Sequence, residues 1–281
     1  MEEHVTLISA LSKEKNNIQS ILSTLRKLEK ITEFPEKNLH KIKTEINKAS
    51  KKLITNNLLD SIKEEISTQL KNYQDQIPEW EEKAKKVFFE ELESVLKEAG
   101  YTLRGDISRL MVSVFTIELN LDSLKVIIWY GNKQENVISC RLNPEAVAAK
   151  LAVAEKKIIE RDFDSETFLS QLFTAYKTAS ERVTGRDKTR VPISGVLKEY
   201  VYLIQTKKFY MNPSRNNFVG YERAFFSYDL HRLENRVISG NELHLITATR
   251  AYTRKKSDFL WVPSDLLGNG DYISHISFKE I

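Results

Sequence analysis

The chain has 281 residues, with 43 basic and 39 acidic side chains, a formal net charge of +4 and a single cysteine, Cys140. No apolar run approaches the roughly 18 residues that a membrane span needs, and the first residues do not resemble a secretory signal peptide. A lone cysteine excludes a disulfide framework and a cysteine-ligated zinc site. We therefore expect a cytoplasmic protein without membrane partners, folded as one large or two modest domains.

Residues 1–99 are predicted to form long helices, because this stretch has no glycine and contains only two prolines, Pro35 and Pro78. Both prolines are expected to be joints between helices, since proline lacks a backbone donor and disfavours helix in the residue before it. Apolar residues recur at three- and four-residue spacing through the stretch. This pattern predicts a helical hairpin or coiled-coil arm with an apolar seam.

The seam of this arm has two interpretations. It can close within the chain, as an antiparallel hairpin packed on the rest of the protein, or it can pair with a protein partner or a second copy of the chain. Only five aromatic residues lie within 1–99, so the arm has little material for a thick core and needs a further surface. The candidate partner-binding residues on the seam are Leu22, Leu25, Ile42 and Ile46.

Residues 100–281 have the pattern of an α+β domain. Strands are predicted at 111–119, 124–130, 137–142, 242–252, 259–262 and 272–278. Four helices are predicted between the third and fourth of these strands, at 144–160, 164–183, 192–208 and 218–235. The expected fold class is α+β: a long-helix arm followed by a mainly antiparallel sheet with four inserted helices. The last strands are expected to rejoin the first sheet.

Positive charge is concentrated in residues 181–256, which hold 15 basic and 7 acidic residues. Arginine suits phosphate groups because its planar guanidinium donates two parallel hydrogen bonds, so a basic patch on loops is one signature of a nucleic-acid interface. The alternative is that acidic neighbours neutralise these side chains on solvated faces. The candidate nucleic-acid-binding residues are Arg182, Arg186, Arg190, Arg232, Arg236, Arg250, Arg254, Lys255 and Lys256.

The helix predicted at 218–235 carries two apolar stripes. One stripe is enough to anchor a surface helix, so the second indicates either a helix enclosed on two sides or one that offers a face to a partner. The candidate partner-binding residues of the second stripe are Tyr221, Phe225 and Tyr228.

Motifs for catalysis are absent from the sequence. Gly268 and Gly270 have neither the lysine of a P-loop nor the spacing of a dinucleotide fingerprint, and no Gly-x-Ser-x-Gly elbow occurs. The acidic residues Asp162, Asp164 and Glu166 are interpreted as a helix start rather than a cation site. No catalytic residue, metal ligand or cofactor is predicted.

The hypothesis that these features favour is a non-catalytic accessory or scaffolding subunit of a multiprotein assembly. It would dock or self-associate through residues 1–99 and present a basic, aromatic α+β surface. The alternative is a sequence-independent DNA- or RNA-binding protein, and an enzyme whose site one sequence does not reveal is a third hypothesis. In architecture alone, and without a shared motif, the chain is similar to accessory subunits of bacterial ATPase systems that act on DNA.

Overall fold

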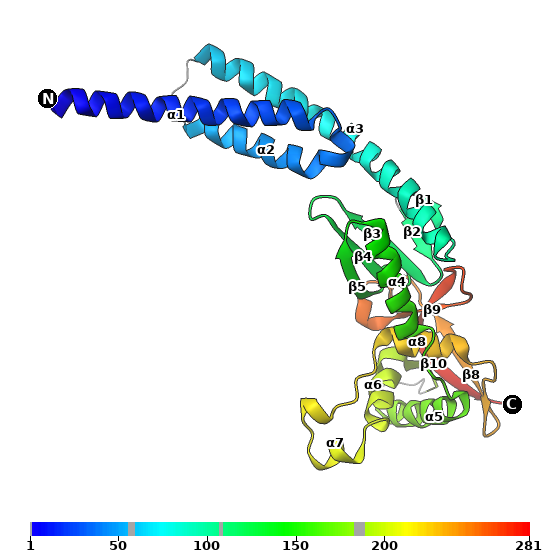
Figure 1. Ribbon diagram of the computed structural model, residues 1–281. Coiled ribbons are helices and arrows are strands. Elements are labelled where there is room, and N and C mark those ends of the chain that lie inside the picture. Colours follow the sequence, from blue (N-terminus) through cyan, green and yellow to red (C-terminus); the bar gives the residue numbers. More distant parts are fainter. Residues whose placement is uncertain (1, 56–59, 107–108, 183–188) are drawn as a thin grey trace. The chain divides into compact units, whose positions relative to one another are not determined.

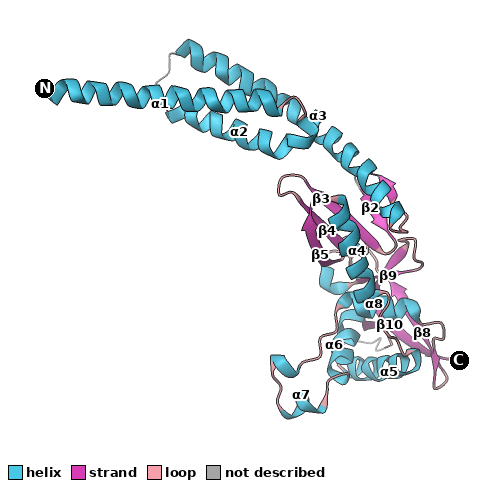
Figure 2. Cartoon of the chain, viewed as in Figure 1, coloured by secondary structure: helices cyan, strands magenta, loops and turns pink. Residues whose placement is uncertain are grey.

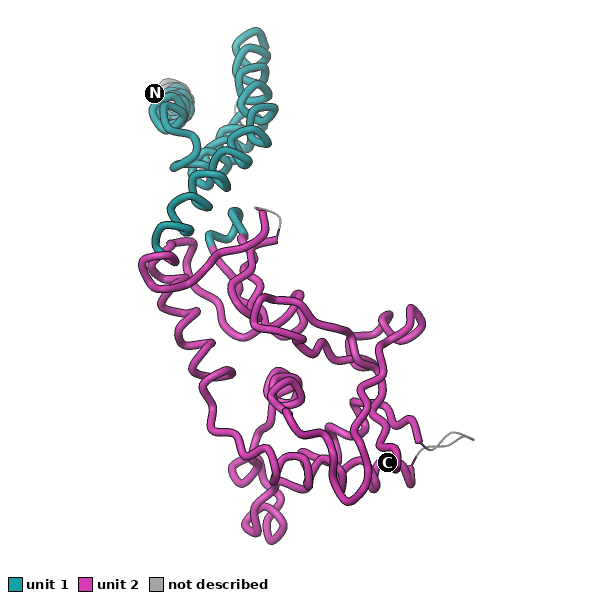
Figure 3. The backbone as a smooth tube through the Cα atoms, turned by 90° about the vertical axis from the view of Figure 1, so that its right-hand side faces the viewer, with its two compact units in different colours: residues 1–95, 120–124 teal, residues 96–119, 125–281 magenta. Residues whose placement is uncertain are grey.

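A computed structural model describes residues 2–55, 60–106, 109–182 and 189–281. The chain is a mixed α+β protein with two antiparallel sheets (Figure 1 and Figure 2). It divides into unit 1, Met1–Val95 with Asn120–Leu124, and unit 2, Leu96–Leu119 with Lys125–Ile281 (Figure 3). The boundary expected between residues 99 and 100 remains a prediction. Within the described ranges, no helix combines the length and the apolarity that crossing a membrane requires.

The helices of unit 1 are α1 (Glu2–Ile31), α2 (Pro35–Thr55) and most of α3 (Asp60–Glu98). The joint predicted at Pro35 is confirmed, because α2 begins at this residue, where a missing backbone donor breaks no helical bond. The joint predicted at Pro78 is wrong, because α3 runs through this residue. Pro78 is exposed, so water can reach the carbonyl that loses its donor, and Trp80 anchors the following turn in the core.

The three helices of unit 1 pack on one apolar core. Ile42 and Ile46 of α2 are fully buried in it, with Leu28 from α1 and Trp80 from α3 beside them. Over this stretch the seam therefore closes within the chain. The buried members of the core are Leu28, Leu39, Ile42, Ile46, Ala49, Leu53, Leu70, Trp80 and Ala84.

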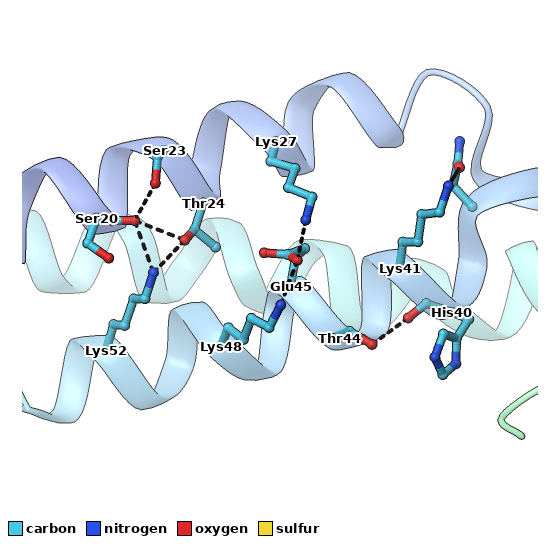
Figure 4. A network of polar contacts seen from close by, with 11 residues as sticks. Ser20, Ser23, Thr24, Lys27, His40, Lys41, Thr44, Glu45, Lys48 and Lys52 are labelled. Atoms are coloured by element: carbon cyan, nitrogen blue, oxygen red, sulfur yellow. Dashed lines mark hydrogen bonds and ion pairs between the residues drawn. The ribbon is translucent and has the colours of Figure 1, made fainter.

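Polar contacts fix how α1 and α2 lie along each other (Figure 4). The buried carboxylate of Glu45 accepts hydrogen bonds from Lys27 at 2.6 Å and Lys48 at 3.0 Å. About two helical turns after Glu45 on α2, Lys52 donates to the Ser20 carbonyl at 3.1 Å and to the Thr24 hydroxyl at 2.9 Å. The hydrogen bond from Lys27 lowers the pKa of Glu45, with burial opposing it and Lys48 reinforcing it. These contacts set one register between the helices.

The first sheet of unit 2 joins neighbouring strands in sequential order. Its described strands are β1 (Arg104–Asp106), β2 (Arg109–Val112), β3 (Phe115–Asn120), β4 (Lys125–Tyr130) and β5 (Glu135–Arg141). The single strand predicted at 111–119 is wrong, because Ser113 adopts a φ of 51° and the chain turns there between β2 and β3. Helix α4 (Pro144–Ile158) packs on β4 and β5 and is capped by the Asn143 side chain, which accepts from the Ala146 N–H.

The second sheet is built from the strands that follow. These are β6 (Val191–Pro192), β7 (Val237–Ile238), β8 (Asn241–Thr247), β9 (Leu260–Pro263) and β10 (Gly270–Glu280). Their order is β6-β10-β8-β7, and β9 also pairs with β10. The expectation that the last strands rejoin the first sheet is therefore wrong. The apolar side chains of Ile273, Ile276 and Phe278 on β10 pack into a separate core with the helices of unit 2.

The remaining described helices are α5 (Ser165–Glu181), α6 (Ile193–Leu203), α7 (Lys207–Met211), α8 (Arg223–Arg232) and the 3-10 turns η1 (Arg215–Asn217) and η2 (Lys256–Asp258). Asp164 caps α5 as expected, accepting from the Thr167 N–H at 3.1 Å. The single helix predicted at 192–208 is wrong and divides into α6 and α7 around Gln205. The helix predicted at 218–235 begins late, because the Gln205 amide bonds both backbone groups of Val219 and holds it outside any helix.

Trp261 of β9 connects the two sheets of unit 2. Its ring centroid lies 5.4 Å from that of Tyr130 on β4, and the rings meet edge to face. Gly131 lies so close to this ring that a Cβ there would be 2.5 Å from it. Ser227 of α8 donates to the Trp261 carbonyl and shares a hydrogen bond of 2.9 Å with the Tyr130 hydroxyl. The two sheets of unit 2 are thus packed on each other through buried contacts.

Candidate functional site

The apolar seam of α1 continues beyond the part that unit 1 buries. Ile21 and Leu28 are buried in the unit, whereas Leu11, Ile18 and Leu22 are 62%, 47% and 39% exposed. Figure 1 shows the N-terminal part of α1 extending past α2 and α3. We call Leu11, Ile18 and Leu22 the α1 stripe. It is an apolar surface at helical spacing that lacks the packing given to the rest of the seam.

A groove of about 610 Å³ lies between α1 and α3, next to the α1 stripe. Leu25 and Ile66 provide its apolar lining. The polar residues that line it are Ser61, Glu64, Glu65, Thr68 and Gln69. Through Leu25 the groove adjoins the α1 stripe, and its α3 side carries two carboxylates, Glu64 and Glu65.

The structure separates the predicted partner-binding residues of the arm. Leu22 is exposed on the α1 stripe and Leu25 lines the groove, so both are accessible to a partner. Ile42 and Ile46 are fully buried in the core of unit 1, so they are not at its surface. Leu11 and Ile18 were missed as site residues. The seven-residue spacing from residue 11 to 18 to 25 was the signal available for them.

The second predicted partner surface, on α8, is enclosed. Tyr228 is buried, and the Tyr221 ring lies 5.0 Å from that of Tyr200 within the core of unit 2. Phe225 is half-buried beneath the guanidinium of Arg161, 4.4 Å from its ring centroid. These three aromatic residues therefore make contacts within unit 2, and their role as partner contacts stays a prediction. The second stripe of the helix is covered because α8 is packed on two sides.

A charged cluster lies at the end of α8. The buried carboxylate of Asp229 accepts two hydrogen bonds of 2.7 Å from Arg161 and further ones from Arg232 and the Tyr221 hydroxyl. Arg232 also donates to the Arg161 carbonyl at 2.7 Å and lies 4.1 Å from the Phe163 ring. The guanidinium of Arg232 is therefore engaged by contacts within unit 2, unlike an exposed arginine that is available to a phosphate.

The same cluster changes the ionisation of nearby tyrosines. Burial raises the pKa of Tyr221 far above its usual value, and the charge of Asp229 adds to the effect. Burial, again with Asp229 nearby, raises the pKa of Tyr200 to about 12. Both hydroxyls therefore stay protonated at neutral pH. Because donors bind both oxygens of Asp229, this cluster ties α8 to Arg161 and Tyr221, and we call it a structural lock.

The other predicted basic residues differ in their exposure and in the contacts that they make. Arg182 pairs with Glu199 at 2.5 Å, and Lys256 lies 3.8 Å from Glu135 and above the Trp129 ring. Arg236 is half-buried, Arg190 is exposed but already holds an interaction within the chain, and Arg186 lies outside the described residues. The exposed members that form no ion pair with another described residue are Arg250, Arg254 and Lys255.

These three cations share one loop, between β8 and η2. Tyr252 fixes the loop through an edge-to-face contact of 4.8 Å with His275 of β10, and His275 is itself opposite Pro192 of the edge strand β6. The loop is thus attached to one edge of the second sheet with its basic side chains in solvent. Of the predicted basic patch, this loop holds the exposed residues that form no ion pair with another described residue.

Two features of the described ranges concern reactive groups, namely the spacing of potential metal ligands and the surroundings of the cysteine thiol. No three His, Cys, Asp or Glu side chains there come close enough to hold a metal ion. Cys140 is half-buried on β5, where burial raises the pKa of its thiol and disfavours the reactive thiolate. Its surroundings are those of a small structural side chain.

Comparison with protein-family models, with curated proteins and with solved structures gave no match to this chain. No relative therefore supplies a function. The accessible surfaces of the described residues include the α1 stripe with its groove and the exposed loops of unit 2.

Proposed function

We propose that this chain is a non-catalytic accessory or scaffolding subunit of a multiprotein assembly, and that it docks through the α1 stripe. The observation that carries the proposal is the apolar spacing of the α1 seam, which continues from Leu25 back to Leu11 with one polar break at Lys15. Its C-terminal part is buried by α2 and α3, and its N-terminal part, at Leu11 and Ile18, is exposed. A helix that continues the packing of α2 or α3 past the end of the bundle would cover this part.

The occupant that fits is an amphipathic helix of another subunit. Covering one Leu or Ile side chain contributes about 1.5–3 kcal/mol when it is fully removed from water, so the three stripe residues supply several kcal/mol of gross stabilisation. The groove beside the stripe extends this contact through Leu25 and Ile66. Its carboxylates, Glu64 and Glu65, favour lysine or arginine on the flank of the partner helix. A second copy of the chain is a special case of the same mode.

A tagged pull-down from the source cell, run with and without nuclease, tests this function. The full chain should recover a stoichiometric protein partner that survives nuclease, and the double variant Leu11→Asp, Ile18→Asp should lose it. Both residues are exposed, so circular dichroism of the variant should stay that of the parent.

The matched control is Val153→Asp, which places the same charge on an exposed apolar position of α4. It should recover the partner as the parent does. Equal recovery by the stripe variant would contradict docking through α1. Sedimentation of the parent and the stripe variant shows whether the partner is a second copy.

A second candidate function, sequence-independent nucleic-acid binding, keeps support from Arg250, Arg254 and Lys255. They are exposed on one loop and form no ion pair among the described residues. With three cations available, the salt dependence of binding should be shallow, with a slope of about 2 to 3 on duplex DNA. Recovered proteins that all disappear after nuclease treatment would favour this candidate over the docking function.

A further inference from the structure

The segment from Tyr202 to Val219 forms a protruding part of unit 2, which we call the aromatic knob. It holds α7 and η1 and is drawn in yellow in Figure 1. Large apolar side chains in the knob face solvent: Tyr202 is 61%, Tyr210 53% and Met211 88% exposed. None of the three belongs to the core of unit 2. Such a patch on an otherwise well-packed unit indicates a binding surface.

The aromatic rings of the knob touch one another. The centroid of the Phe209 ring lies 6.2 Å from that of Tyr202, 6.1 Å from that of Tyr210 and 5.7 Å from that of Phe218, and each pair meets edge to face. Edge-to-face packing leaves the outward faces of the outer rings uncovered. The knob therefore presents several flat π surfaces at different angles.

Hydrogen bonds hold this arrangement in place. At the base, the Gln205 amide donates to the Val219 carbonyl at 3.0 Å and accepts from the Val219 N–H at 2.9 Å, which closes the segment. Within it, the Tyr210 hydroxyl donates to the Tyr202 carbonyl, and the Asn217 amide donates to the Asn212 carbonyl at 2.9 Å. A surface ordered before binding loses less entropy when a ligand arrives.

The charge of the knob has one sign. Lys207, Lys208 and Arg215 are exposed, and no acidic residue occurs between Tyr200 and Tyr221 in the sequence. In the described part of the chain, none of these three cations forms an ion pair. An anionic ligand is therefore the one that complements the surface.

We propose that the aromatic knob binds single-stranded nucleic acid. Unpaired bases offer flat faces that stack on aromatic rings, and the phosphates between them pair with lysine and arginine. The knob places three cations among four rings over a short segment, and the amides of Asn212 and Asn216 are exposed beside them for the edges of bases. Duplex DNA hides its base faces, so the surface favours single strands.

The polar groups of the knob argue against insertion into a membrane. Lys207, Lys208 and Asn212 directly flank the exposed Tyr210 and Met211, so the apolar tip cannot enter a bilayer without taking charges or amides with it. Removing such groups from water without partners is unfavourable. This surface is also separate from the α1 stripe, and the proposal does not depend on docking through α1.

Fluorescence anisotropy of the full chain tests the knob. The probes are labelled oligo(dT) and oligo(rU) of about 20 nucleotides, longer than the site of one small binding surface. Both should bind at low salt, more tightly than a duplex of the same length. Tyr210→Ala and Phe218→Ala should each weaken binding about tenfold. Tyr210→Phe keeps the ring and loses only the hydrogen bond to the Tyr202 carbonyl, so its loss of affinity should be clearly smaller than that of Tyr210→Ala. The double variant Lys207→Ala, Lys208→Ala should lower the salt slope by about 1.4.

Two controls separate the knob from the other surfaces. Arg254→Ala, in the loop between β8 and η2, should change the affinity less than twofold, and the variant Leu11→Asp, Ile18→Asp should leave it unchanged. The proposal is overturned by absence of oligonucleotide binding at low salt, by equal binding of Tyr210→Ala and the parent, or by a larger loss for Arg254→Ala than for the ring variants. Binding to phosphatidylserine vesicles without binding to either oligonucleotide would also overturn it.

Discussion

Unit 1 and unit 2 bury their apolar side chains in different ways. In unit 1 the core consists mainly of leucine and isoleucine side chains, such as Leu28 and Ile46, which recur along the helices. In unit 2 the core combines aliphatic side chains with a cluster of rings, in which the Phe168 centroid lies 5.3 Å from that of Tyr200 and 6.1 Å from that of Phe226. A linear seam can run past the helices that cover it, whereas a ring cluster has no such continuation. The docking proposed for α1 rests on this difference.

The buried carboxylates of the two units also differ in how far their cationic partners are exposed to solvent. In unit 1 the buried carboxylate of Glu45 meets two lysines that are themselves more than half exposed, so water still reaches the pair. In unit 2 the carboxylate of Asp229 meets Arg161 and Arg232, both largely shielded from solvent. The arm is therefore held by a screened network and unit 2 by an unscreened one. Substitutions in the two units, taken from the largest expected effect to the smallest, test these differences in packing and in electrostatic screening.

Asp229→Asn should lower the free energy of unfolding of unit 2 by about 4 kcal/mol, because it leaves two shielded guanidinium groups without their counter-ion. Urea unfolding followed by fluorescence measures the loss. Asp164→Asn is the matched control, since Asp164 is an exposed helix cap and asparagine caps equally well. A loss at Asp229 as small as that at Asp164 would show that the cluster is not a lock.

Ile46→Ala and Ile18→Ala make the same change on two parts of the arm that the sequence spacing treats alike. Ile46 is fully buried, so its truncation should destabilise the arm by about 3 kcal/mol. Ile18 is largely exposed, so its truncation should change stability by less than about 0.5 kcal/mol in the isolated chain. Hydrogen exchange of peptides from α1 and α2 measures both. Comparable losses would mean that the N-terminal part of α1 is already covered.

The arm was predictable from local features. The lack of glycine and the three- and four-residue spacing gave its helices, and Pro35 marked a helix start by its backbone chemistry, as Asp164 did for α5 in unit 2. The prediction of a joint at Pro78 failed because a helix tolerates proline when the carbonyl that loses its donor faces water. Whether that carbonyl faces water depends on how α3 packs, which the local sequence does not give. Which part of the seam is buried was equally undecidable, since Ile18 and Ile46 have the same local pattern.

The site residues of unit 2 were the least predictable. Arg232 and Arg254 are the same residue type in the same basic stretch, yet one is clamped to Asp229 and the other faces solvent. The difference depends on Arg161, which lies 68 positions from Asp229 in the sequence. Likewise, alternation across 111–119 gave no sign of the turn at Ser113, whose positive φ is unusual for a residue other than glycine.

Acidification should loosen the contact between α1 and α2 through Glu45. Its pKa is lowered in the folded arm, so its contribution is complete above the unfolded value of about 4.3 and is lost as the pH falls through the folded value. Hydrogen exchange of α2 peptides should therefore accelerate between about pH 5 and pH 3. Glu45→Gln should lower arm stability by about 1 kcal/mol at neutral pH, since the lysines are solvated, and should flatten this pH dependence. Glu118→Gln, which removes a similarly lowered carboxyl of unit 2, should leave the α2 profile unchanged. If hydrogen exchange of α2 in the Glu45→Gln variant accelerates as steeply with acid as in the parent, other carboxylates cause the effect. The ion pairs of Glu45 would then not be what holds α1 to α2.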